Sequence, residues 1–145
     1  MIDDDLVKII LAGVHENNSL QTLNFSHNRL TNVGARRISK VLLKKSNILY
    51  INISNNQIGY EGSRYLAQTL KKNTTVLGLD LKLNFFNDKA ACKFFKDISK
   101  NKTLMELDLS ANLIGDGVRI FWNIFLPNQC RQLRKSVNTW RTTAV

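Results

Sequence analysis

The sequence predicts an α/β solenoid in which short strands alternate with helices and stack side by side. Three observations predict it. A skeleton of apolar residues that ends near an asparagine occurs four times, at a spacing of 28 residues. Each skeleton contains an alternating triplet such as Leu23-Asn24-Phe25, which is typical of a strand with one buried face. A segment with apolar residues at helical spacing, such as Ile38 and Leu42, then follows.

The four copies divide the chain into repeats. We expect these at residues 20–47, 48–75, 76–103 and 104–127. A half repeat at residues 1–19 precedes them, and it consists of the helical part alone. The fourth copy is one residue shorter around Gly115-Asp116-Gly117, and Pro127 ends the pattern. Residues 128–145 fit no repeat, so we expect either a cap over the last repeat or a basic tail.

One asparagine of each skeleton is expected in a turn, where its side-chain amide satisfies backbone groups that would otherwise stay unpaired. These residues are Asn28, Asn56, Asn84 and Asn112. The skeleton L-x-x-L-x-L-x-x-N-x-L resembles the leucine-rich repeat, and the period with its helix resembles the ribonuclease-inhibitor-like subclass. The resemblance implies a right-handed leucine-rich-repeat solenoid, a short horseshoe arc with parallel strands on its concave face and helices on its convex face. It also implies that the four asparagines form a buried ladder.

Composition and charge exclude several classes of protein. A chain of 145 residues with 43% hydrophobic and 22% charged residues suits one globular domain. No apolar run approaches the length of a membrane span. Cys92 and Cys130 are too few for a disulfide framework, which favours a reducing compartment. The acidic start at residues 3–5 is unlike a secretory or mitochondrial leader. We therefore expect a cytoplasmic protein.

No catalytic constellation stands out in the sequence. His15 and His27 lie far apart in the repeat register, and no cysteine and histidine cluster has metal-ligand spacing. No phosphate-binding glycine-rich loop occurs. Asp80, Glu106 and Asp108 could come close on neighbouring strands, as acid–base catalysis requires, but the repeat already accounts for their positions. We expect no enzyme activity, no cofactor and no metal site.

Candidate partner-binding residues lie at the strand positions that point away from the core. Tyr50 is the most plausible anchor, because tyrosine is enriched among the residues that dominate interface energies. The predicted concave-face set is Tyr50, Asn52, Asp80, Lys82, Glu106 and Asp108.

The positive charge is expected on the helices, away from their buried stripe. The chain carries a net charge of +10, and no acidic residue occurs between Asn17 and Tyr60. The predicted convex basic face consists of Arg36, Arg37, Lys40, Lys44, Lys89, Lys93, Lys96 and Lys100. Two interpretations stay open: a merely solvated surface, or a surface that docks on an acidic partner such as polymerised tubulin or nucleic acid. Aromatic residues are not interleaved with these lysines, which argues against base stacking and leaves contacts to phosphates alone.

We expect a non-catalytic protein–protein interaction scaffold within a multi-subunit complex. The segment "LDLKLNFFND", with Lys82 before Leu83 and Asn84, is similar to repeats in leucine-rich subunits of the ciliary dynein regulatory complex. That resemblance implies a cytoskeletal setting in the cilium axoneme, with tubulin or axonemal proteins as partners. Two alternatives remain, a basic nucleic-acid-associated protein and a GTPase-regulating leucine-rich-repeat protein. Ran activators of this subclass have a longer arc and an acidic tail, which this chain lacks.

Overall fold

The computed structural model describes residues 1–44 and 47–118. Strands and helices alternate along this part of the chain. The helices are α1 (Asp4–Glu16), α2 (Asn32–Leu43), α3 (Tyr60–Leu70) and α4 (Asp88–Ile98). The strands are β1 (Thr22–Asn24), β2 (Tyr50–Asn52), β3 (Gly78–Asp80) and β4 (Glu106–Asp108).

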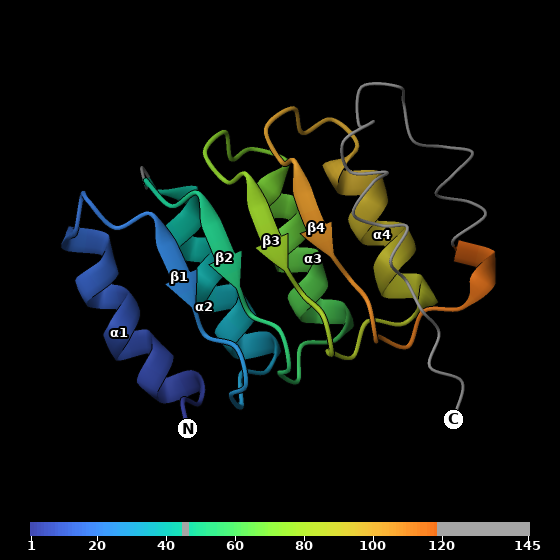
Figure 1. The fold of residues 1–145 in the computed structure, drawn as a ribbon, viewed down its shortest axis with the longest axis horizontal. Helices are drawn as coiled ribbons and strands as arrows, with labels where there is room; N and C mark the ends of the chain where they lie inside the picture. The colour runs from blue at the N-terminus through green and yellow to red at the C-terminus, as the bar shows by residue number, and fades with distance from the viewer. Residues whose placement is uncertain (45–46, 119–145) are drawn as a thin grey trace.

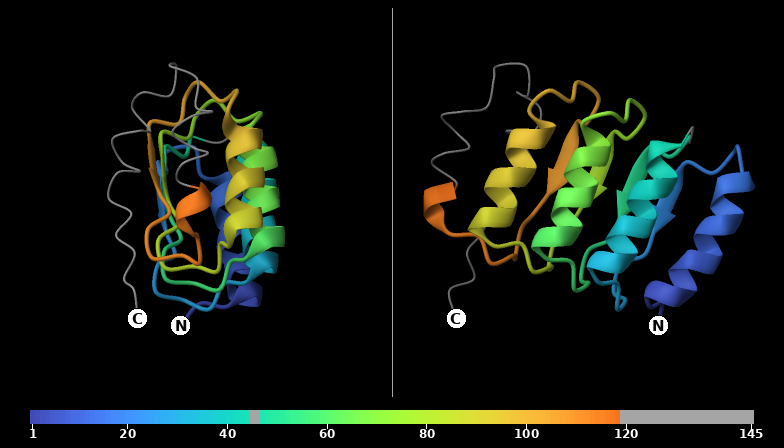
Figure 2. Two further views of the ribbon diagram at one scale, coloured as in Figure 1. Left: turned by 90° about the vertical axis from the view of Figure 1, so that its right-hand side faces the viewer. Right: turned by 180° about the vertical axis from the view of Figure 1, so that it is seen from behind.

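The four strands form one parallel sheet in the order β1-β2-β3-β4, and paired residues on adjacent strands are 28 positions apart. All four helices lie on the same side of this sheet, which gives the two layers seen in Figures 1 and 2. The predicted solenoid, with parallel strands on one face and helices on the other, is confirmed. We call these the concave strand face and the convex helix face.

The hydrophobic core lies between the two layers. Inward strand residues such as Ile51 and Ile53 pack against the helix stripe, represented in α3 by Leu66 and Leu70, and all four are at most 2% exposed. Each such aliphatic side chain contributes about 1.5–3 kcal/mol through burial. Gly13, which the sequence pattern places in the stripe of α1, is exposed instead, and a Cβ there would meet nothing within 4 Å.

Each ladder asparagine bonds backbone groups of its own repeat and of the repeat before it. Oδ1 of Asn56 accepts the Leu30 N–H at 2.9 Å, and its Nδ2 donates to the carbonyls of Phe25, Ile53 and Ser54. Asn84 repeats this pattern one repeat later, where its Oδ1 accepts the Ile58 N–H at 3.0 Å. Asn28 and Asn112 do the same for Ile2 and Phe86.

The residue before each ladder asparagine has a positive φ. The four angles are His27 56°, Asn55 50°, Leu83 54° and Ala111 53°. Asparagine and histidine tolerate this left-handed conformation better than most residues, whereas leucine and alanine adopt it at a cost of about 1–2 kcal/mol. In the third and fourth repeats, the turn before the ladder asparagine therefore holds a leucine and an alanine in a backbone conformation that these residues disfavour.

A second row of side chains caps the N-terminal ends of the helices, where the turn after each strand leads into the next helix. Asp3, Thr31 and Asn87 are the N-cap residues of α1, α2 and α4, and each accepts a hydrogen bond from the first turn of its helix. Gly59 caps α3 without a side chain. Oδ1 of Asn32, from the preceding repeat, accepts the N–H groups of Gly59 and Gly62 in its place.

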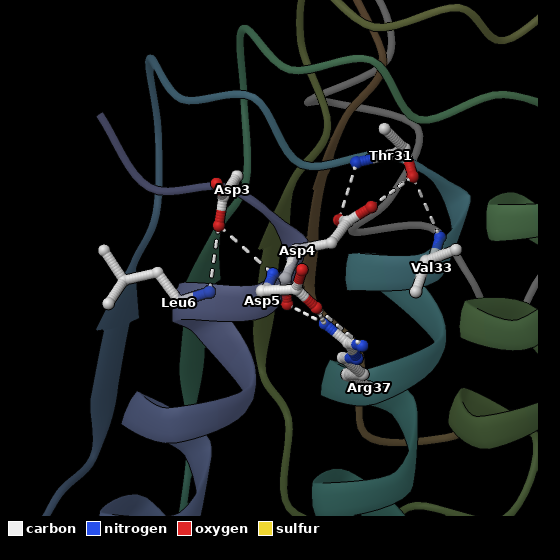
Figure 3. A network of polar contacts seen from close by, with 7 residues as sticks. All are labelled: Asp3, Asp4, Asp5, Leu6, Thr31, Val33 and Arg37. Atoms are coloured by element: carbon white, nitrogen blue, oxygen red, sulfur yellow. Dashed lines mark hydrogen bonds and ion pairs between the residues drawn. The ribbon is translucent and has the colours of Figure 1, made fainter.

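The first two helices are joined by an additional polar network, shown in Figure 3. The carboxylate of Asp4 accepts from Thr31 at both N and Oγ1, at 3.0 and 2.5 Å. Arg37 on α2 donates to the carbonyl of Asp4 and to Oδ1 of Asp5, the latter at 3.2 Å. These contacts fasten α1 to the first complete repeat at its N-terminal end.

A third row lies at the turns that lead from helix to strand. Oδ1 of Asn73 accepts the N–H groups of Thr75 and Val76. Asn101, 28 positions later, and Asn17, 56 positions earlier, accept in the same way. The Nδ2 of Asn101 also donates to the Leu70 carbonyl of the preceding repeat. Hydrogen bonds between neighbouring repeats therefore occur both at the turns after the strands and at the turns before them.

The predictions for the last part of the chain lie outside the described residues. They concern the helical stripe of the fourth repeat after Val118 and the cap or tail at residues 128–145.

The Asn56→Ala substitution tests the ladder. It leaves the buried Leu30 N–H without its acceptor, while the three carbonyls each keep another donor. The expected loss in the free energy of unfolding is about 1–3 kcal/mol, measured by urea denaturation. Gln57→Ala, at the exposed neighbouring position, is the control and should change it by less than about 0.5 kcal/mol. Equal effects of the two variants would contradict the assignment.

The Leu83→Asn substitution tests the left-handed turn. Leu83 is 44% exposed, so little packing is lost, and asparagine occupies the equivalent position 55 with the same sign of φ. We expect the free energy of unfolding to rise by about 0.5–1 kcal/mol, because the backbone strain is relieved. A melting midpoint that stays the same or falls would show that the leucine is not strained.

Candidate functional site

The concave strand face carries two rows of outward side chains in register. One row runs through Tyr50, Gly78 and Glu106, which pair directly across β2, β3 and β4. The other row runs through Asn52, Asp80 and Asp108 on the same strands. Five of the six predicted concave-face residues therefore lie on adjoining strands within these two rows, and Lys82 lies exposed two residues after Asp80.

Tyr50 lies against the backbone of the neighbouring strand. A Cβ placed on Gly78 would be only 2.7 Å from Cδ1 of Tyr50 and 3.5 Å from Oε2 of Glu106. The tyrosine side chain therefore occupies the space that any larger residue at position 78 would fill. Tyr50 is nevertheless 42% exposed. Gly78 was not among the predicted partner-binding residues, although its pairing with Tyr50 follows from the period of 28 residues.

The second row also shapes the turns at the ends of the strands. Oδ1 of Asn52 accepts the Ser54 N–H, Oδ1 of Asp80 accepts the Lys82 N–H, and Oδ1 of Asp108 accepts the Ser110 N–H. The distances are 3.0, 2.9 and 2.8 Å. One oxygen of each side chain is thus engaged within the protein. These three residues have a structural role that the sequence-based interpretation did not assign to them.

Asp80 is an acidic residue whose surroundings shift its pKa. Partial burial raises its pKa above the ordinary value of 3.8, the bond from the Lys82 N–H opposes this, and the nearby Asp108 carboxylate raises it further. The concave strand face therefore holds acidic groups close together toward β4, with Glu106 exposed beside them.

The convex helix face is basic, but two of its predicted members are paired within the protein. Arg36, Lys40, Lys44, Lys89, Lys96 and Lys100 are exposed. Arg37 instead bonds to residues of α1, and its side chain is 26% exposed. Lys93 forms an ion pair with Asp97 one turn along α4. The partner of Lys93 follows from the i,i+4 spacing on a helix, although no such pair was predicted from the sequence. The partner of Arg37 does not follow from spacing, because it lies 32 positions away.

The described residues offer no metal site and no membrane span. No group of three or more histidine, cysteine, aspartate or glutamate residues within 1–44 and 47–118 is placed to hold a metal ion. Within the same ranges, no helix is both long and apolar enough to cross a bilayer.

The Asp80→Asn substitution tests the electrostatics of this face. Asparagine keeps the acceptor for the Lys82 N–H, as Asn52 does for Ser54. Because the folded-state pKa of Asp80 is raised, its contribution to stability is present below pH 3.8 and is lost as the pH rises through the folded value. Asp80→Asn should therefore raise the free energy of unfolding at pH 7, and the gain should shrink as the pH approaches 3.8. Urea denaturation at several pH values measures this, and a gain independent of pH would contradict it.

Comparison with known proteins agrees with the geometry. The Leucine Rich repeat family model matches residues 16–39, 44–67 and 100–117, which is less than half of the chain. No curated protein sequence matches. Among solved structures, "Leiomodin-1 Actin-Binding Site 2 (ABS2)" superposes with a TM-score of 0.75 at 18% identity, over 94% of this chain and 79% of that one. The sequence matches, the parallel sheet and the structural likeness together show that this chain folds as a leucine-rich-repeat solenoid.

Proposed function

We propose that this chain is a non-catalytic scaffold that binds a partner protein through its concave strand face, with Tyr50 as the anchor. The observation that carries the proposal is the position of Tyr50, which is 42% exposed and lies against Gly78. An exposed aromatic ring that is already held in place loses little conformational freedom on binding. A tyrosine of this kind is suited to dominate the energy of an interface.

The chemistry around Tyr50 indicates what a partner would present. Glu106 lies beside the anchor, and Asp80 and Asp108 pair in the adjoining row. A basic side chain next to an apolar or aromatic group would complement this arrangement. The raised pKa of Asp80 adds to the argument, because an approaching cation relieves the repulsion between its carboxylate and that of Asp108.

We further propose a cytoskeletal setting within a larger assembly. The similarity of the segment around Lys82 to dynein regulatory complex subunits, and the basic convex helix face, support axonemal proteins and acidic tubulin as partners. The name of the structural neighbour, an actin-binding site, supports actin filaments as an additional polymer to test.

The test uses the tagged full-length chain in its own cells, with cross-linking and mass spectrometry. We expect Lys82, the lysine nearest the two rows, to cross-link to one main partner, and Tyr50→Ala to reduce recovery of that partner about tenfold. Thr22→Ala, at the exposed equivalent position on β1, is the matched control and should leave recovery unchanged. Equal recovery with Tyr50→Ala would contradict the proposed anchor.

Co-sedimentation of the purified chain with actin filaments and with microtubules tests the setting. The proposal predicts that the wild-type chain pellets with one of these polymers. A wild-type chain that stays in the supernatant with both would contradict a direct cytoskeletal partner.

A further inference from the structure

A second surface lies on the convex helix face, where α2, α3 and the near side of α4 enclose a shallow groove of about 510 Å³. Its lining comes from the outer and facing sides of these helices. The residues are Arg36, Ser39, Lys40, Leu43, Tyr65, Gln68, Thr69, Lys71, Lys72, Lys93 and Asp97. It lies on the opposite layer from the Tyr50 surface, so the two surfaces are separate.

The size of the residue at one repeat position does not by itself decide where a groove lies. The equivalent residues at steps of 28 are Leu11, Ser39, Ala67 and Phe95, and all four are buried. Leu11 lines a groove of about 490 Å³ between α1 and α2, and Ser39 lines the present groove of about 510 Å³. The two grooves differ in the charged and apolar side chains around them.

Ser39 is a buried polar residue beside the groove. It is 3% exposed and belongs to the lining. Its Oγ has no hydrogen-bond partner within the described residues and is closed to solvent, so a ligand in the groove does not reach this atom in the structure. A ligand would therefore contact the charged and apolar side chains at the surface of the groove.

The charge of the lining specifies the ligand class. Arg36, Lys40, Lys71, Lys72 and Lys93 are five cationic side chains. They face one carboxylate, that of Asp97, which is already bonded to Lys93. Such an excess of positive charge attracts an anionic ligand.

An apolar part of the groove favours a peptide over a nucleic acid. Leu43 is 55% exposed at the groove, which provides a contact for an aliphatic side chain. The ring of Tyr65 is the aromatic surface available there. The guanidinium groups of Arg36 and Arg64 already lie 5.5 and 6.0 Å from its centroid, where a stacked base would have to bind.

We propose that the groove between α2 and α3 binds an acidic peptide segment of a partner protein. Carboxylates of the segment pair with Lys40 and Lys72, and an aliphatic side chain packs on Leu43. The neighbouring groove between α1 and α2, of about 490 Å³, is a weaker candidate because Glu16 lines it and Arg37 is engaged with Asp5.

The test is fluorescence anisotropy of the full chain with a labelled peptide of repeated Glu-Glu-Leu. Its Gln-Gln-Leu counterpart is the ligand control. We expect the first to bind and the second to bind at least about tenfold more weakly. The pair Lys40→Glu and Lys72→Glu should weaken binding about tenfold, whereas the pair Lys96→Glu and Lys100→Glu, outside the groove with the same change of charge, should stay within about twofold.

Leu43→Ala tests the apolar contact, because Leu43 is 55% exposed at the groove. With a circular dichroism spectrum like that of the wild type, it should weaken binding at least about threefold while every charge is kept. The proposal is overturned if both double variants weaken binding equally, or if both peptides bind alike. It is also overturned if single-stranded oligo-dT displaces the peptide at a lower concentration than unlabelled Glu-Glu-Leu peptide does.

Discussion

The hydrogen bonds of one asparagine in each repeat hold the rest of the structure in register. The side chain of Asn56 reaches a backbone N–H and a carbonyl of the preceding repeat while it also bonds two carbonyls of its own turn. Strands of only three residues form few backbone hydrogen bonds with one another. In a solenoid each repeat contacts only its neighbours, so stability depends on such interfaces between repeats. Asn56 and Asn84 are buried, whereas Asn28 and Asn112, at the first and last of these interfaces, are half-buried rather than buried as the resemblance implies. All four provide a specific polar part of an interface.

This constraint also explains how the two candidate surfaces arise. Because the register is fixed at 28 residues, side chains at equivalent positions form rows across the strands and across the helices. A change of residue size within a row then creates a local feature. Glycine at position 78 makes room for the ring of Tyr50 on the concave strand face. Basic side chains on and next to α2, α3 and α4 line a groove on the convex helix face together with Leu43 and Tyr65. The scaffold is repetitive, and its candidate sites depend on residues that differ between repeats.

The repeat pattern predicted the strands, the helices and the turn positions of the four asparagines, because equivalent residues recur every 28 positions. The parallel arrangement of the strands and the placing of the helices on the other face came from the resemblance to leucine-rich repeats. Contacts between distant residues were not predictable in the same way. The bonds of Arg37 to α1 depend on rotamers and on the distance between neighbouring helices. Comparison of residue size along the strand row would have indicated the space that Tyr50 fills beside Gly78.

Amide hydrogen exchange of the full chain, followed by NMR, tests the central claim most directly. The N–H groups of Leu30 and Ile58 bond to ladder asparagines and lie outside the strands and helices. The account predicts that they exchange only through global unfolding, with the same protection as the Ile51 N–H at the centre of β2. Exchange of Leu30 and Ile58 as fast as that of exposed loop amides would show that the asparagine side chains do not hold the repeats together.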